Sequence, residues 1–326
     1  MARALVAGGN GFIGSFLVER LLKEGFEVHC LVRKRSDLRF IKDLPVKIFF
    51  GELIKPNTLI EPLKDIKYVF HIAAKKRAFK ESQYDEVNET GTLNLLEASK
   101  NSGAVKKFIY VSSLAVMGPN ANDVPWTEED PCKPISFYGK SKLKGEEAAK
   151  QYQSSFSVTI LRPPPVYGPR DLDLLPIFNM VKMRIKPQLG RKEQITSLVY
   201  VEDLADAIFE ASQTDKASGK TYFVCDRKQY SFNEIIDQIS VGLKRKGINI
   251  IIPGFLLYTV AFINQIFCWI FRKPPVLNVQ KASELLQAYW MCSSKKIEKE
   301  LGFVTKTSLP EGIKKSIDWY RANKLL

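Results

Sequence analysis

Two kinds of segment alternate along the first half of the chain. Apolar runs of strand length, rich in Val, Ile and Phe, are separated by longer stretches whose apolar residues recur at helical spacing. Strands that read as continuous apolar runs are typical of a parallel sheet, because helices bury such a sheet on both faces. The pattern predicts an α/β fold with a doubly wound parallel sheet, whose strands cover residues 4–7, 27–32, 46–50, 68–72, 108–111 and 158–161.

The alternation of strand-like and helix-like segments stops at residues 163–165, which are three consecutive prolines. Proline is excluded from helix interiors and from central strands, so we expect the chain to leave the sheet here. It is expected to return over residues 198–211 and 221–224, and then to leave again with a helix that Ser231 caps. The pattern predicts a sheet domain of residues 1–165 with a return segment, 197–225, and a smaller lobe of residues 166–196 and 226–326.

An uncharged apolar stretch, residues 249–271, lies between two clusters of basic residues. It is long enough to span a bilayer. However, Pro253 and Gly254 interrupt its beginning, Asn264 and Gln265 interrupt its middle, and basic residues on both flanks give no signal of orientation. We favour an apolar helix of the smaller lobe, either as an apolar wall of the substrate site or as core, with peripheral membrane contact as the alternative.

Composition excludes several classes of protein. With 326 residues, 45% hydrophobic and 26% charged, the chain is neither disordered nor collagen-like nor a coiled coil. Five scattered cysteines form no CxxC pair, and there are only two histidines, so a disulfide framework, a metal site and a Ser-His-Asp triad are all disfavoured. No charged and apolar leader precedes the first strand, and we therefore expect a cytoplasmic location.

The formal net charge of +14 favours phosphorylated cofactors, anionic substrates or an anionic surface. The basic residues are spread along the chain, and no motif interleaves them with aromatic side chains. We therefore expect small-molecule ligands and no nucleic-acid partner.

The first predicted strand leads into a glycine-rich turn, GGNGFIG. The spacing of Gly8, Gly11 and Gly14 allows a tight turn and a close approach of the backbone to a pyrophosphate. Phe12 and Ile13 begin the following helix, whose first N–H groups are suited to binding phosphate. Between a first strand and a first helix, this motif predicts a dinucleotide site in a Rossmann-like fold.

The end of the second predicted strand indicates which dinucleotide is bound. A carboxylate at this position would bind a free ribose 2′-hydroxyl, but the strand is followed by Arg33, Lys34 and Arg35. The planar guanidinium of arginine suits a 2′-phosphate. We therefore favour NADP over NAD, with Arg33 as the contact. The alternative is a solvated basic turn from which Asp37 reaches the ribose of NAD.

Tyr138 and Lys142 are four residues apart in a predicted helix, so their side chains share one face. An ammonium group near a phenol lowers the phenol pKa from its usual value of about 10. Such a phenol can protonate a carbonyl oxygen or deprotonate an alcohol. The fifth predicted strand ends nearby in sequence at Ser112 and Ser113, at the carboxyl edge where open α/β sheets bind ligands.

Seven segments, in this order, resemble the extended short-chain dehydrogenase/reductase family, which includes NAD-dependent epimerases and dehydratases. The resemblance covers nearly the whole chain and is closest to the dihydroflavonol reductase-like and 3β-hydroxysteroid dehydrogenase-like branches. The segments are GGNGFIG, VFHIAA, VNETGTLNLLEA, YVSSLAVMG, YGKSK, RPPPVYGPRD and YVEDLADAI.

The resemblance implies a catalytic set of Ser113, Tyr138 and Lys142, with Asn88 supporting the backbone of the active site. Tyr138 would exchange the proton, and Lys142 would hold the nicotinamide ribose and lower the tyrosine pKa. Ser113, in preference to Ser112, would bind the substrate oxygen. Further cofactor contacts implied by the resemblance are Ala73, Ala74 and Lys75 at the ribose, Glu52 and Leu53 at the adenine, and Pro163 and Val166 at the nicotinamide.

Departures from the family's sugar-nucleotide enzymes narrow the substrate. Pro165 stands where those enzymes commonly have Asn, and Thr196 and Ser197 stand where they have an Arg-Asp pair, so donors for a pyrophosphate are missing. We expect an NADP-dependent oxidoreductase acting on a carbonyl or secondary alcohol of an apolar substrate. The alternatives are an NDP-sugar epimerase or dehydratase with tightly bound NAD, and a non-catalytic NADP-sensing protein. Helices over residues 85–98 and 138–152 are candidates for a homodimer interface.

Overall fold

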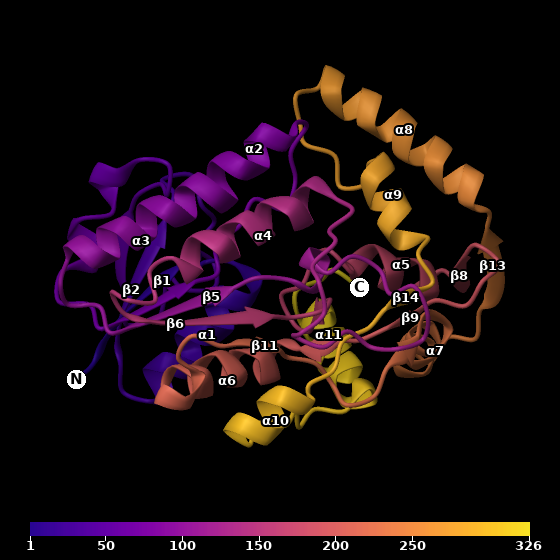
Figure 1. Ribbon diagram of the computed structural model, residues 1–326. Coiled ribbons are helices and arrows are strands. Elements are labelled where there is room, and N and C mark those ends of the chain that lie inside the picture. The colour runs from indigo at the N-terminus through magenta and orange to yellow at the C-terminus, as the bar shows by residue number, and fades with distance from the viewer.

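The computed structural model describes residues 1–326 and is built on a seven-stranded parallel sheet with helices on both faces (Figure 1). All six predicted strands are present, and the predicted return segment supplies the seventh, so the predicted fold is confirmed. The direction of strand addition reverses between β1 and β4, the point at which such sheets bind ligands. In sheet order, the strands are β3 (Lys47–Phe50), β2 (Glu27–Val32), β1 (Arg3–Ala7), β4 (Tyr68–His71), β5 (Lys107–Val111), β6 (Ser157–Arg162) and β11 (Thr221–Phe223).

Side chains of β1 alternate between two cores, as the two-residue period of a strand requires. Ala4 and Val6 join the core under one layer of helices, whereas Leu5 and Ala7 join the core under the other. Both faces of the strand are therefore buried, which is the physical reason for its continuous apolar sequence. The helices are α1 (Phe12–Lys23) and α6 (Val201–Ser212) on one face, and α2 (Glu81–Asp85), a π-helical segment (Glu86–Thr90), α3 (Gly91–Asn101) and α4 (Phe137–Lys150) on the other.

The rest of the chain forms short strands and further helices, most of them to the right of the sheet in Figure 1. One hydrophobic core contains both Ile208 of α6 and Ile313 of α11, so the division into two lobes stays a prediction. The strands are β7 (Val166–Tyr167), β8 (Ile185–Leu189), β9 (Ile195–Thr196), β10 (Val199–Tyr200), β12 (Tyr230–Ser231), β13 (Ile248–Ile252) and β14 (Tyr289–Trp290). The helices are α5 (Leu175–Lys182), α7 (Phe232–Leu243), α8 (Gly254–Ile270), α9 (Val279–Leu285), α10 (Lys295–Leu301) and α11 (Leu309–Ala322).

The predicted start of α7 is confirmed by its cap. The Ser231 hydroxyl oxygen accepts a hydrogen bond from the Glu234 backbone N–H at 3.1 Å. This contact satisfies one of the free donors at the helix start, which is why serine precedes so many helices.

The apolar stretch of residues 249–271 forms most of β13 and all of α8, with Pro253 between them. The expectation that its helix lies in the core is wrong. Within α8 only Leu257 and Ala261 are buried, and the other large apolar side chains of the helix face outward. None of the helices combines the length and the apolar character that crossing a bilayer requires.

Candidate active site

Several of the predicted site residues lie one or two positions after the ends of neighbouring strands of the sheet. Gly8 follows β1 and Arg33 follows β2. Ala73 and Ser113 lie two residues beyond β4 and β5, and Pro163 follows β6. Because parallel strands end at the same edge, these residues lie together at the carboxyl edge of the sheet, where folds of this kind have their ligand crevice.

The glycine turn has the backbone geometry that a dinucleotide pyrophosphate requires. Gly8 has a φ of +90°, and a Cβ at Gly14 would lie only 2.1 Å from the carbonyl oxygen of Gly8. Helix α1 has no acidic residue in its first turn, and Gly11 provides no side chain to cap it. The N–H groups of Phe12 and Ile13 thus have no intrahelical acceptor, and the positive end of the helix faces the crevice. These features fit the pyrophosphate of NAD or NADP.

The basic turn after β2 leaves its cationic side chains unpaired. Arg33, Lys34 and Arg35 are exposed. The Asp37 carboxylate, by contrast, accepts hydrogen bonds from the backbone N–H and the Nε of Arg39 at 2.9 and 2.5 Å. Arg39 therefore occupies the carboxylate that would have to reach an NAD ribose from this turn.

The two residues predicted at the adenine, Glu52 and Leu53, follow β3 and differ in the burial of their side chains. The Glu52 carboxylate accepts a hydrogen bond from Lys55 Nζ at 2.6 Å, and this contact lowers the Glu52 pKa, with a smaller electrostatic contribution from Arg33. Leu53 is only 8% exposed and packs in the core against α3. Glu52 thus lies near Arg33 at the cofactor edge, whereas the Leu53 side chain is largely inside.

Asn88 connects the loop after β4 to the start of α4. It lies in the π-helical segment, a distortion often found at functional sites, and is only 1% exposed. Its Oδ1 accepts from the Lys75 N–H at 2.7 Å, and its Nδ2 donates to the Lys75 carbonyl at 3.1 Å and to Ser141 Oγ at 2.9 Å. Ser141 Oγ in turn donates to the Tyr138 carbonyl at 2.9 Å. The Asn88 side chain therefore fixes the position of the loop after β4 relative to the start of α4.

Local packing brings the start of α4 against the turn after β5. The Ser136 hydroxyl oxygen accepts from the Gly139 N–H at 3.2 Å and so caps α4 two residues before Tyr138. A Cβ at Gly139 would lie 2.4 Å from the Ala115 carbonyl oxygen, so only glycine allows this approach. Ser113 Oγ, which accepts from the Ala115 N–H at 3.1 Å, thereby comes close to Tyr138.

The pKa of Tyr138 shifts in the direction opposite to our expectation. Burial raises it to about 12, although a hydrogen bond with Ser113 opposes the rise. Lys142 does not contribute the lowering of the Tyr138 pKa that we expected. Lys142 Nζ donates to the Val111 carbonyl at 2.8 Å and lies 4.0 Å from the centroid of the Tyr110 ring. Burial lowers the Lys142 pKa to about 7, and Glu146 partly opposes this.

Two further buried polar residues lie beside the set. Ser112 is 4% exposed, and its hydroxyl has no hydrogen-bond partner. His71 donates through Nε2 to Thr92 Oγ1 at 2.8 Å, because the Thr92 hydroxyl proton goes to the Asn88 carbonyl. Burial, with a smaller effect of Lys142, lowers the His71 pKa to about 3, so this ring stays neutral and structural.

Residues near the nicotinamide end are held by backbone contacts. Pro163 is buried, and its carbonyl accepts from the Leu114 N–H at 2.8 Å. Val166 belongs to β7 and pairs with Val199 of β10. The position of both predicted residues is therefore set by their main chain at the end of β6.

Sequence reasoning missed the residues that α9 and the buried ion pair contribute. Gln280 Oε1 of α9 accepts from the Phe137 N–H at 3.4 Å, and the Glu284 carboxylate is near enough to raise the Tyr138 pKa slightly. Arg162 binds Glu146 of α4 through two hydrogen bonds of 2.9 and 2.7 Å. No sequence signal marks the α9 contact, since 143 residues separate its partners.

Lys76 and Arg77 extend the crevice wall by pairing with Asp173. Lys76 Nζ lies 2.8 Å from Asp173 Oδ2, and Arg77 binds the other carboxylate oxygen. The ion pairs tie the loop after β4 to the segment before α5.

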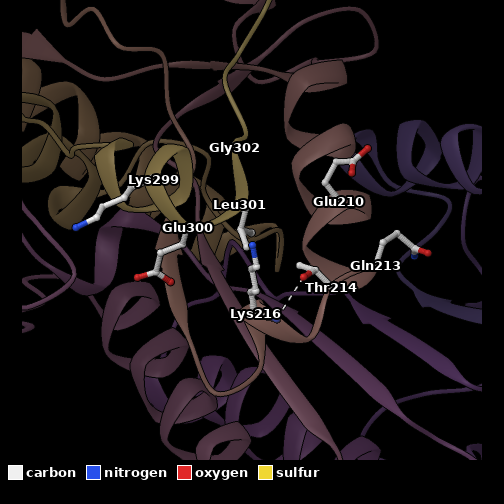
Figure 2. Close-up of a pocket in the computed structure, with 8 residues that line it drawn as sticks. All are labelled: Glu210, Gln213, Thr214, Lys216, Lys299, Glu300, Leu301 and Gly302. Atoms are coloured by element: carbon white, nitrogen blue, oxygen red, sulfur yellow. Dashed lines mark hydrogen bonds between the residues drawn. The ribbon is translucent and has the colours of Figure 1, made fainter.

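A separate cavity of about 470 Å³ lies at the opposite edge of the sheet (Figure 2). It is formed by the end of α6, the turn before β11 and the end of α10. Its lining is almost entirely polar, and none of the predicted site residues belongs to it. The cavity therefore has no part in the cofactor crevice. Its lining residues are Glu210, Gln213, Thr214, Lys216, Lys299, Glu300, Leu301 and Gly302.

Comparison with known proteins agrees with this crevice. The sequence model of the NAD dependent epimerase/dehydratase family matches residues 4–225, a range that contains the glycine turn, Ser113, Tyr138 and Lys142. The chain belongs to this family. It is an NAD(P)-dependent enzyme of the extended short-chain dehydrogenase/reductase type, as the seven sequence segments predicted.

Relatives in this family differ in what their names say they act on. A ceramide reductase of Caulobacter vibrioides is 30% identical over 326 residues, covering 98% of this chain and 96% of the relative. A decarboxylating sterol-4-alpha-carboxylate 3-dehydrogenase of Mus musculus is 26% identical, covering 97% and 90%. The solved UDP-glucose 4-epimerase of Thermus thermophilus, in complex with NAD, superposes with a TM-score of 0.79 at 25% identity, covering 98% and 99%.

Proposed function

We propose that the protein is an NADP-dependent oxidoreductase that interconverts a carbonyl and a secondary alcohol on an apolar substrate. The observation that carries the proposal is the meeting of Ser113 and Tyr138 at the carboxyl edge, beside a glycine turn suited to pyrophosphate. The glycine turn follows β1 and Ser113 lies beyond β5, two strands of one sheet that only β4 separates, which favours a fixed reaction geometry.

The bound dinucleotide would supply or accept the hydride at its nicotinamide ring. Tyr138 is suited to reduction, because a pKa raised by burial keeps its phenol protonated at neutral pH and able to donate to a carbonyl oxygen. Ser113 Oγ accepts from the Ala115 N–H and hydrogen-bonds Tyr138, so its hydroxyl would turn from the tyrosine to the same carbonyl oxygen when substrate binds. Two donors would thus stabilise the negative charge that develops there.

Lys142 has a positioning and an electrostatic role in this proposal. One of its three N–H donors binds the Val111 carbonyl, which leaves others for the ribose hydroxyls of a cofactor. A charged ammonium would also stabilise the phenolate that Tyr138 becomes after giving up its proton. Asn88 would act through the backbone, by holding Lys75 and, through Ser141, the start of α4.

The proposal of NADP in preference to NAD rests on charge at the end of β2. Arg33 is exposed and free of ion pairs, and the only acid in the turn, Asp37, is occupied by Arg39. A 2′-phosphate would supply the anion that this turn lacks.

The proposal of an apolar substrate has two supports. Relatives that match almost the whole chain bear the names ceramide reductase and sterol-4-alpha-carboxylate 3-dehydrogenase. In addition, Ser197 is fully buried, and its hydroxyl exchanges hydrogen bonds with the Cys292 main chain at 3.0 and 3.2 Å. Thr196 Oγ1 donates to main-chain carbonyls at 3.0 and 3.3 Å. Neither hydroxyl is free to replace the Arg-Asp pair that would bind a sugar-nucleotide pyrophosphate.

An NDP-sugar epimerase with tightly bound NAD is the second candidate, and the fold similarity to the UDP-glucose 4-epimerase with NAD favours it. Fluorescence titration of the purified protein with NADPH and with NADH separates the two candidates. We expect tighter binding of NADPH, and an Arg33→Ala variant should lose about 10- to 100-fold in NADPH affinity while its NADH affinity is unchanged.

Arg321→Ala is the matched control for this titration, because it removes an exposed arginine that forms no ion pair in the last turn of α11. It should leave both affinities unchanged. Equal or tighter binding of NADH by the wild-type protein, or NAD that co-purifies and resists exchange, would overturn the NADP assignment.

A further inference from the structure

Helix α8 presents a large apolar surface to the outside of the molecule. Isolated exposed apolar residues are ordinary, but a contiguous apolar face on one helix marks an interaction surface. Phe262 is 57% exposed, Ile266 46% and Trp269 69%. We call the exposed side the α8 outer face and define it by Phe255, Phe262, Ile263, Ile266, Phe267 and Trp269.

The two amide residues of α8 do not interrupt this face, because both bind the main chain that leads into α9. Asn264 Nδ2 donates to the Leu277 carbonyl at 2.7 Å, and Gln265 Oε1 accepts from the Val279 N–H at 3.4 Å. These contacts fasten α8 to the chain that leads into α9. The two residues that disfavour a membrane span thus lie off the outer face. Thr259 is exposed between Phe255 and Ile263, but its hydroxyl donates to the Phe255 carbonyl at 2.9 Å.

Charge around the α8 outer face is of one sign. No acidic residue occurs between Asp237 and Glu284, whereas six basic residues do. Lys281 pairs with Glu284, but the other five are exposed and form no ion pair. These five lie before β13 and after α8, and they are Lys244, Arg245, Lys246, Arg272 and Lys273.

We propose that α8 lies in the plane of an anionic phospholipid bilayer, with its outer face at the boundary of the acyl chains. An apolar helix face flanked by basic residues and rich in Phe and Trp has the chemistry of an interfacial helix. Arg272 and Lys273 at the C-terminal end of α8, together with the basic cluster before β13, would contact anionic headgroups. The helix has 17 residues and does not meet the requirements for a membrane span, which agrees with a position on the surface.

A second copy of this chain fits the surface less well than lipid does. A two-fold dimer through the α8 outer face would bring the same patch of each copy together. The five unpaired basic residues would then face like charges without an acidic partner nearby. An anionic bilayer supplies both the apolar phase and the opposite charge.

Helix α9 links this surface to the proposed active site. Helix α9 packs beside α8 (Figure 1) and carries Gln280, which binds the Phe137 N–H at the start of α4. A docked molecule would therefore present the edge of its crevice to the bilayer. That an apolar substrate enters from the lipid rests on the proposed function, whereas the docking of α8 does not.

Co-sedimentation of the full chain with phospholipid vesicles tests the docking directly, without substrate or cofactor. We expect binding to vesicles of phosphatidylcholine with phosphatidylglycerol, weaker binding to phosphatidylcholine alone, and a decrease at high salt. The double variant Phe262→Glu, Ile266→Glu should bind about tenfold or more weakly. Its control is Ile60→Glu, Val124→Glu, which places the same charges at exposed apolar positions outside α8.

A second pair of variants tests the electrostatic part. Arg272→Glu with Lys273→Glu should weaken binding to the anionic vesicles by about tenfold or more. Lys100→Glu with Lys220→Glu changes the net charge equally at exposed lysines on the sheet domain, and should have a much smaller effect. Circular dichroism of each variant verifies that the fold is retained.

Three results would overturn the docking proposal. One is a wild-type protein that stays in the supernatant with anionic vesicles. Another is vesicle binding that survives both charge-introducing variants of α8. The third is a dimer in light scattering that Phe262→Glu, Ile266→Glu dissociates, since a second copy would then cover the face. A protein that binds vesicles but reduces no ketone would instead contradict the proposed function alone.

Discussion

The carboxyl edge of the sheet and helix α8 are both made largely of apolar chain, yet they present opposite groups to the outside. At the edge, strands buried on both faces end in loops that expose backbone N–H groups, hydroxyls and Arg33. In α8, the amides of Asn264 and Gln265 bind inward, and the aromatic side chains face outward. An apolar run therefore predicts burial only where neighbouring elements cover both of its sides.

The largest expected loss of stability is at the buried ion pair beneath the active site. Replacing Glu146 by Gln leaves the buried Arg162 guanidinium without its carboxylate, and should lower the free energy of unfolding by about 3–5 kcal/mol. Urea denaturation measures the change. The neighbouring variant Glu147→Gln alters an exposed residue that forms no ion pair and should cost under about 0.5 kcal/mol. Equal effects of the two variants would show that the pair does not stabilise α4.

Truncating an aromatic side chain should cost far more unfolding free energy in the sheet than on the α8 outer face. Phe108 in β5 is fully buried, and Phe108→Ala should cost about 3–5 kcal/mol in the free energy of unfolding. Phe262 on the α8 outer face is 57% exposed, so Phe262→Ala should cost about 0.5 kcal/mol or less. A large loss from Phe262→Ala in urea denaturation would mean that α8 is covered by the protein itself.

The smallest expected effect is a pH dependence of stability that Lys142 causes. Burial lowers the Lys142 pKa to about 7 in the folded protein, against its ordinary value of 10.5. Between these values the unfolded chain binds more protons, so the free energy of unfolding rises with pH through this range. Lys142→Met should flatten the rise measured from about pH 7 to about pH 8.5. An unchanged slope in the variant would show that Lys142 keeps an ordinary pKa.

Local signals explain what the sequence predicted well. The apolar runs of the strands, the glycine turn and the Ser231 cap each depend on residues within a few positions of one another. They also placed Gly8, Arg33, Ser113 and Pro163 at one edge, because parallel strands end there together.

What the sequence did not predict depends on tertiary surroundings. The rise of the Tyr138 pKa comes from burial, which no spacing of Tyr and Lys encodes. The contact between Gln280 and Phe137 joins positions 143 residues apart. The exposure of α8 likewise follows from the absence of a covering element beyond α9, whereas its composition alone favoured burial.

The central claim is that Tyr138 and Ser113 serve carbonyl reduction at the carboxyl edge. It is tested most directly with NADPH carrying deuterium at the transferred position, a long-chain methyl ketone or a steroid ketone in detergent, and mass spectrometry of the alcohol. We predict deuterium on the carbinol carbon, and a loss of about 10²- to 10⁴-fold in turnover for Tyr138→Phe at nearly unchanged NADPH affinity. The control Tyr152→Phe removes a hydroxyl that binds Glu97 beyond the far end of α4, and should keep full activity. Undiminished turnover in Tyr138→Phe, or epimerisation of a UDP-sugar without any labelled alcohol, would contradict the account.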